Sequence, residues 1–220
     1  FAAALFQDPE FVHWTNALSR LEGSWSYLLL KTNLPNAFVA EILPRRIFIT
    51  VGMFQFIGND DELALVLGHE VSHLIMGHTS QANYLQTIMR TVEVLLLSVD
   101  PTEGLLTLAI VGGIAAIRTS FAAAFSREHE READELGIKL AAMACYDTRK
   151  AAAVFQKLHQ AEIPPSTARR LLSFADSHPP SADRYQELLQ ASEEQNAAKY
   201  ADTTCPGVQS KMRSMLWRFT

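Results

Sequence analysis

The chain has 220 residues, of which 48% are hydrophobic and 20% are charged, which is enough for a compact domain with a real core. Its formal net charge of -5 argues against a nucleic-acid-binding protein. We expect one domain over residues 1–220, with a core at about 30–195, an apolar insert at 92–125 and a C-terminal tail at 199–220. The chain opens on Phe1, which is typical of a fragment or a processed form.

The apolar pattern predicts a mostly α-helical α+β fold. Two short β-branched and aromatic runs, at residues 37–41 and 47–51, are separated by Pro44-Arg45-Arg46 and predict an antiparallel strand pair. Prolines at Pro164-Pro165 and Pro179-Pro180 mark breaks in the helical part. Helices are expected at residues 9–21, 59–77, 80–98, 126–144, 148–160 and 181–198.

Residues 105–117 form an uncharged, strongly apolar run of 13 residues. A helix that spans a bilayer needs about 20 apolar residues, so this run is too short to cross one alone. Asp100, Glu103 and Arg118 flank it and limit its extension. Two interpretations remain open: a buried hairpin or core helix, and a segment that lies against a membrane.

The stretch LGHEVSHLIMGH places His69 and His73 four residues apart on a predicted helix. Positions i and i+4 are about 400° apart, so both imidazoles share one face and can meet one ion. Zn²⁺ takes imidazole ligands at about 2.0–2.1 Å. Glu70 lies about 100° round the helix, beside the ion without being a ligand, as in an H-E-x-x-H zinc protease. The alternative is a polar helix face with solvated histidines.

A zinc protease needs a third protein ligand and leaves the fourth position for water. Glu130 and Asp134 are again i and i+4 on one predicted helix, so one of them can ligate zinc while the other accepts a hydrogen bond from a ligand histidine. Among the other polar residues near the two motifs, His78 is expected at a helix end and His129 at the surface. Glu128 and Glu132 are expected to be solvated and to pair with Arg127 or Arg131.

HEVSH followed by SREHEREAD resembles the gluzincin family that contains the heat-shock protease HtpX, the CAAX prenyl protease and the Oma-type mitochondrial inner-membrane metalloendopeptidase. The family's HExxH…ExxxD pattern implies His69, His73 and Glu130 as ligands of one Zn²⁺ per chain, with Asp134 behind them. Asn36-Ala37-Phe38 resembles the family's N-A-F, and His178-Pro179 with Arg184 resembles its late H-P…R motif. The resemblance covers roughly residues 36–188.

The resemblance implies a metalloendopeptidase with a small antiparallel sheet beside the HExxH helix. Glu70 would accept a proton from the attacking water and pass it to the leaving amine. His178 would stabilise the oxyanion or act as a transient fourth ligand, and Arg184 would orient His178 or bind substrate backbone. If residues 47–51 form a sheet edge near the zinc, Ile47 and Ile49, together with Asn36, would bind an extended substrate.

The segment around Cys145, and Cys205 well downstream of it, look most like the Oma-type branch. That likeness implies a Cys145–Cys205 disulfide and a protease domain facing the intermembrane space at the mitochondrial inner membrane. Its substrates would be membrane-associated proteins that undergo quality control, and residues 92–125 would contact the membrane. A homo-oligomer is also compatible with the resemblance. A bacterial periplasmic or envelope protease of the same family is the main alternative for localisation.

Two other classes of function stay open. One is an inactive chaperone or adaptor that keeps the fold, and the intact Glu70 argues against it. The other is a structural zinc site, which usually has four protein ligands, often cysteines. Neither cysteine lies near the histidine and glutamate motifs in the sequence.

Overall fold

A computed structural model describes residues 21–40, 43, 45–102, 104–160, 178, 182–202 and 205–208. The expected helix at 9–21 is described only at Leu21, and Pro164-Pro165 and Pro179-Pro180 lie outside the described residues. The chain divides into two compact units: a first unit of Phe1–Met76 with Glu132–Thr220, and a second unit of Gly77–Arg131. The boundary at Arg131 falls inside one continuous helix, α6 (Leu105–Met143), which therefore contributes to both units.

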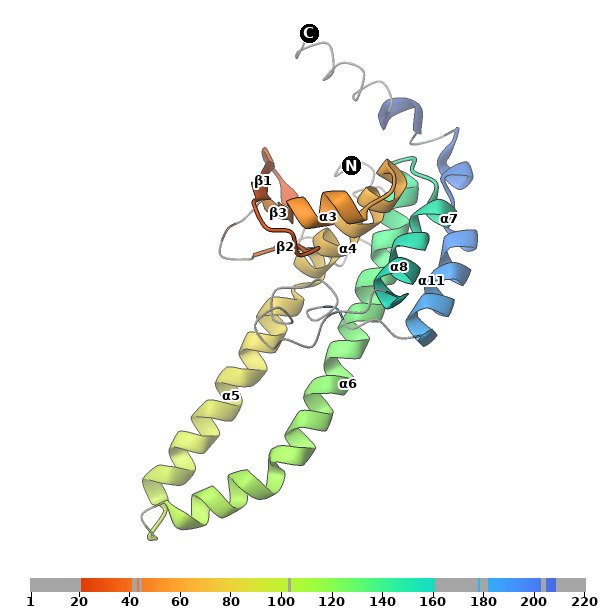
Figure 1. Cartoon of the computed structure of the whole chain (residues 1–220). Helices are drawn as coiled ribbons and strands as arrows, with labels where there is room; N and C mark the ends of the chain where they lie inside the picture. Colours follow the sequence, from red (N-terminus) through yellow and green to blue (C-terminus); the bar gives the residue numbers. More distant parts are fainter. Residues whose placement is uncertain are drawn as a thin grey trace. The chain divides into compact units, whose positions relative to one another are not determined.

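The first unit contains a three-stranded sheet in the order β1–β3–β2, made of β1 (Ser26–Leu30), β2 (Ala37–Val39) and β3 (Arg46–Thr50) (Figure 1). The predicted pairing of the second and third strands is confirmed, because β2 runs antiparallel to β3 with Phe38 opposite Phe48. Strand β1 was not predicted. It pairs parallel to β3, so the sheet is mixed rather than purely antiparallel.

Strand β3 has a neighbour on both sides, which overturns the expectation that it forms a sheet edge. Ile47 pairs with Tyr27 on β1 and with Val39 on β2, while Ile49 pairs with Leu29 and Ala37. Both isoleucine side chains are also buried in the core. The prediction that Ile47 and Ile49 bind substrate is therefore wrong, since their backbone positions are already paired within the sheet and their side chains are covered.

Thr50, at the end of β3, fixes the turn that leads into β2. Its hydroxyl donates to the carbonyl oxygen of Leu34 at 2.6 Å and accepts from the backbone N–H of Asn36 at 2.9 Å. The same oxygen accepts from the N–H of Met53 and so caps α3 (Val51–Phe56). One buried side chain thus positions Asn36, the start of β2 and the next helix.

Helix α4 (Asp60–Met76) carries the HExxH motif and begins and ends as the sequence predicts. Asn59 accepts the backbone N–H of Glu62 at its start, and Gly77 has a left-handed backbone with φ 70° after its end. The buried Glu62 carboxylate also accepts two hydrogen bonds from Lys157 on α8, at 2.6 and 2.7 Å. This partly exposed ion pair holds the first turn of α4 against α8.

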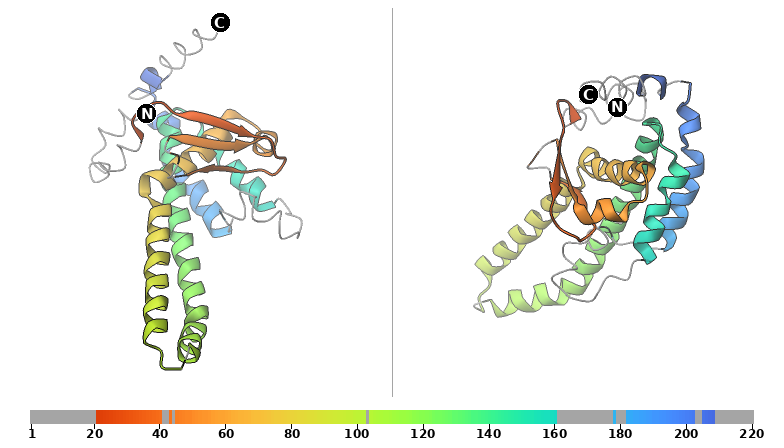
Figure 2. Two further views of the ribbon diagram at one scale, coloured as in Figure 1. Left: turned by 90° about the vertical axis from the view of Figure 1, so that its left-hand side faces the viewer. Right: turned by 45° about the horizontal axis from the view of Figure 1, so that its top comes forward.

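The first unit packs β2 and α7 against α4, while α7, α8 and α11 pack on one another (Figure 2). The predicted helix at 148–160 is interrupted at Ala152, and the one at 181–198 ends in a short 3-10 helix. Because α4 buries residues on most of its faces, its histidines cannot all be solvated. The remaining helical elements are α7 (Thr148–Ala151), α8 (Ala153–Gln160), α11 (Ala182–Glu194) and η2 (Ala197–Tyr200).

The second unit is a hairpin of two antiparallel helices, α5 (His78–Val99) and the first part of α6, joined by a short turn (Figure 1). Asp100 caps the turn by accepting backbone N–H groups from Thr102 and Thr107. Hydrogen bonds, above all from the Thr102 side chain, hold the pKa of Asp100 well below its usual range. The end of the hairpin therefore carries a permanent negative charge.

His129 is not the surface histidine that the sequence predicted. Its ring is buried and stacks on that of His78, with centroids 4.1 Å apart and planes 5° from parallel. Its Nε2 atom also lies 3.2 Å from Gln81 Oε1. His78 is a helix-end residue as expected, and Glu128 forms an exposed pair with Arg131 at 3.5 Å.

The end of α6 is closed by a Schellman motif and a disulfide. The N–H of Tyr146 bonds to the carbonyl of Ala141, and the N–H of Cys145 bonds to that of Ala142. Cys145 itself has a left-handed backbone with φ 72°. Its sulfur is bonded to that of Cys205, with Cα atoms 5.5 Å apart, so the predicted disulfide is present in the structure.

Removing this disulfide should lower the free energy of unfolding by about 2–4 kcal/mol, because the bond closes a loop between residues 60 apart in sequence. Urea unfolding of a Cys145→Ser/Cys205→Ser variant would measure the loss. A Cys145→Gly/Cys205→Ser variant should lose less, since glycine adopts the left-handed backbone without strain. Reductant should destabilise the wild-type protein and leave both variants unchanged, and equal stability of all three proteins would contradict the prediction.

Candidate metal centre

Three histidine rings converge in the first unit. The Nε2 atom of His69 lies 3.1 Å from Nε2 of His73, as the i, i+4 spacing on α4 predicts. The same Nε2 atom lies 3.1 Å from Nδ1 of His178, which is 109 residues away in the sequence. His69 is fully buried and the other two are partly buried. The structure therefore brings the H-P histidine to the HExxH pair, as the sequence motifs imply.

Glu70 is buried beside this cluster and points at the far side of His178. Its Oε1 atom lies 3.3 Å from His178 Nε2. Glu70 lies about 100° round α4 from His69, whereas His69 and His73 share one face of the helix. Its carboxylate therefore reaches the cluster from the side. A carboxylate so placed can accept a proton from a water molecule that enters the cluster.

Asp134 orients His69 from behind. Its Oδ1 atom lies 2.9 Å from His69 Nδ1, which leaves Nε2 facing the other two imidazoles. This is the arrangement expected of a carboxylate that fixes the tautomer of a metal-binding histidine. The structure thus places Asp134 where the sequence predicted it.

Arg184 is in a different place from the one predicted. Arg184 is 6% exposed, and its guanidinium donates to both oxygens of Asp134, from Nε to Oδ2 at 2.9 Å and from Nη2 to Oδ1 at 3.0 Å. A guanidinium held in this way faces Asp134 rather than a substrate. Arg184 is therefore linked to His69 through Asp134, whereas the sequence predicted that it orients His178 or binds substrate backbone.

Glu130 lies one helical turn before Asp134 on α6. One ligand atom from each of His69, His73, Glu130 and His178 falls within 4.8 Å of the others. Ligands of a tetrahedral ion with bonds of about 2.0–2.2 Å lie about 3.3–3.6 Å apart, so contacts of 3.1 Å between ring nitrogens are close to that spacing. The donor set of imidazole nitrogens and a carboxylate oxygen fits a divalent metal ion such as Zn²⁺.

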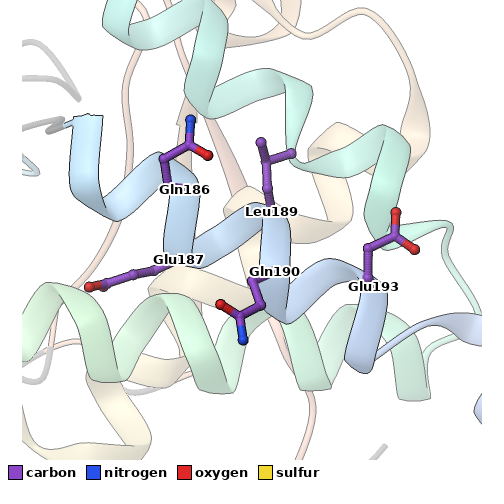
Figure 3. A pocket seen from close by; sticks show the side chains of 5 residues that line it. All are labelled: Gln186, Glu187, Leu189, Gln190 and Glu193. Atoms are coloured by element: carbon purple, nitrogen blue, oxygen red, sulfur yellow. The ribbon is translucent and has the colours of Figure 1, made fainter.

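A shallow hollow also runs along α11, lined by Gln186, Glu187, Leu189, Gln190 and Glu193 (Figure 3). These five side chains come from one helix and include no histidine or cysteine. The hollow therefore offers no ligand set comparable to the histidine cluster, and the candidate site stays at α4, α6 and His178.

Comparison with known proteins agrees with this geometry. Residues 14–192 match Peptidase family M48, which is most of the chain. The chain therefore belongs to Peptidase family M48.

Its relatives include mitochondrial and bacterial proteases. It is 28% identical to the mitochondrial metalloendopeptidase OMA1 of Schizosaccharomyces pombe, over 74% of this chain and 45% of that protein. It is 30% identical to OMA1 of Arabidopsis thaliana, over 80% of this chain and 33% of that protein. It is 23% identical to the beta-barrel assembly-enhancing protease of Escherichia coli, over 71% and 34%. The chain thus spans less than half the length of these relatives.

Replacing Asp134 by Asn should weaken metal binding by about 10–100-fold, because a neutral amide has one acceptor oxygen and cannot serve both His69 Nδ1 and the two Arg184 nitrogens. Arg184→Lys should weaken metal binding by less, since lysine keeps the charge but cannot donate through two parallel N–H groups. Zinc affinity measured by chelator competition would test both changes. Wild-type affinity in the Asp134→Asn variant would contradict the role of Asp134 as an orienting group.

Proposed function

We propose that this chain is the catalytic part of a zinc-dependent metalloendopeptidase, with one Zn²⁺ bound per chain. The observation that carries the proposal is the convergence of the His69, His73 and His178 ring nitrogens, with the buried Glu70 carboxylate 3.3 Å from the last of them. Membership of Peptidase family M48 supports it. His69, His73 and Glu130 would hold the metal, as the family motif implies.

A bound zinc ion would supply a Lewis acid that polarises a peptide carbonyl and acidifies the attacking water. Glu70 would take the proton from that water and deliver it to the leaving amine. Asp134 and Arg184 would keep His69 Nε2 pointed at the reaction centre. His178 would either donate to the developing oxyanion or leave the centre as substrate enters, since its ring contacts both His69 and Glu70.

The substrate would bind as an extended strand along β2 rather than β3. Within the described residues β2 pairs with β3 alone, and it packs against α4. Backbone groups on its other side would pair with a peptide, which gives recognition with little dependence on sequence. Asn36, whose backbone is held by Thr50, stands at the start of this strand and is the substrate-binding residue retained from the sequence.

The substrates would be membrane-associated proteins, cleaved during quality control at the mitochondrial inner membrane, with the bacterial envelope as the alternative. The names of the mitochondrial and bacterial relatives support this pair of locations. The Cys145–Cys205 disulfide supports it too, because disulfides persist in the intermembrane space or periplasm but are rare in a reducing cytosol.

The hairpin of the second unit would contact the lipid surface. Tyr84, Ile88, Val92, Leu95 and Val99 recur at spacings of three and four, which forms one apolar stripe along α5, and all five are exposed. Other exposed apolar side chains surround the turn: Val94, Leu97, Leu105, Leu106 and Ile110. None of the described helices combines the length and apolar character needed to span a membrane.

The depth of contact would be shallow. Interfacial helices lie in the plane of the interface and bury their apolar faces to a depth of about 5–10 Å. Asp100 stays ionised at the end of the hairpin, and a charge in hydrocarbon is costly. The hairpin would therefore lie along the interface rather than enter with its turn first.

Glu70→Gln should abolish peptide-bond cleavage while zinc content stays at about one ion per chain, because Glu70 is a base and not a ligand. Hydrolysis of an unfolded protein, measured beside zinc content, would test this. Removal of zinc by a chelator should also stop cleavage in the wild-type protein, and added zinc should restore it. Cleavage by the Gln variant at the wild-type rate, or by metal-free protein, would overturn the proposed mechanism. Absence of cleavage by the zinc-loaded wild-type protein would favour the adaptor alternative.

Val99→Lys with Leu105→Asp should abolish binding to phosphatidylcholine vesicles. Both charges suit the helix ends at which they stand, so the hairpin should still fold. Vesicle flotation would measure binding. A control with Gln186→Lys and Gln190→Asp adds the same charges to exposed positions on α11 and should bind like the wild type. Equal flotation of the hairpin variant and the control would rule out the lipid contact.

A further inference from the structure

Two glycines meet where α4 and α6 cross in the first unit. Gly68 directly precedes His69, and Gly137 lies three residues after Asp134. A Cβ added to Gly137 would lie 2.9 Å from the backbone nitrogen of His69 and 3.0 Å from its Cα. A Cβ added to Gly68 would lie 2.7 Å from the carbonyl oxygen of Gly137. The two helix backbones therefore touch, with no side chain between them on either side.

Helix formation does not account for these two residues. Both lie inside helices, and neither has the left-handed backbone that favours glycine. Alanine is a better helix former than glycine at such positions. Helices with ordinary side chains at their crossing also pack stably, at axial separations of 8–10 Å. What the two glycines permit is a closer approach of α4 and α6 at this one point.

The close approach of α4 and α6 allows the short side chain of Asp134 to reach His69. An aspartate has a single methylene between its backbone and its carboxyl group, so it reaches only a short distance across a helix crossing. Its Oδ1 atom nevertheless lies 2.9 Å from Nδ1 of His69, the residue whose backbone Gly137 touches. Arg184 donates to both oxygens of the carboxylate, so Asp134 cannot follow if α4 moves away.

We propose that Gly137 is a positioning residue of the metal centre: its contact with the backbone at Gly68 and His69 sets the helix separation at which Asp134 orients His69. This inference rests on the proposed zinc site. A methyl group at position 137 must shift the backbone of α4 near His69, because the atoms it meets belong to the backbone and not to a flexible side chain.

The experiment is a double-mutant cycle with Gly137→Ala and Asp134→Asn, read by zinc affinity in chelator competition. Gly137→Ala alone should weaken zinc binding by about tenfold or more, as expected when an orienting hydrogen bond to a ligand is lost. In the Asp134→Asn background the same change should cost little further affinity, because the charged contact it displaces is already lost and its amide replacement is weak. Circular dichroism of the metal-free proteins would show that each is folded.

Ala141→Gly is the matched control, since it also changes one methyl group at a buried position of α6, one turn further on. It should bind zinc like the wild type. Wild-type affinity in Gly137→Ala, or an equal loss in both backgrounds, would overturn the positioning role. Where Gly137→Ala does not fold, Gly68→Ala replaces it in the cycle, and failure of both to fold would assign the contact to the fold alone. Absence of zinc binding by the wild-type protein would instead refute the proposed function.

Discussion

The buried carboxylate of Asp134 is the constraint on which the rest of the site depends. An unpaired buried charge costs several kcal/mol, so Asp134 is stable in the core only because Arg184 binds both of its oxygens. The Oδ1 atom of the same carboxylate also lies 2.9 Å from Nδ1 of His69. One ion pair therefore joins α4, α6 and α11 and fixes which nitrogen of His69 faces the metal centre.

The surrounding contacts hold α4 and α6, the two helices that carry the candidate ligands, in fixed positions relative to that ion pair. Lys157 holds the first turn of α4 through Glu62, and the backbone contact at Gly68 and Gly137 holds its middle. At the end of α6, the disulfide of Cys145 follows a Schellman motif that terminates the helix. These contacts lie before, at and after the site along the chain, so rotation of either helix would strain at least one of them.

Much of the site could be predicted because its residues repeat at helical spacing. His69 with His73, and Glu130 with Asp134, are i and i+4 pairs, and that spacing alone places each pair on one face. Arg184 could not be placed in this way, because its partner lies 50 residues away on another helix. The parallel pairing of β1 with β3 is likewise non-local. The sequence of β1, SYLLL, is apolar but lacks the period-2 alternation that marks a half-buried strand.

His178 decides whether the centre is structural or catalytic. Structural zinc sites are usually closed by four protein ligands, whereas catalytic sites keep one position for water or substrate. With His178 in contact with His69 the ligand set has four members, yet the buried Glu70 also contacts the His178 ring. A closed structural site gains nothing from a buried carboxylate at that point, and its desolvation is costly. The buried Glu70 therefore supports the proposal of a catalytic site, in which His178 would either donate to the oxyanion or leave the centre as substrate enters.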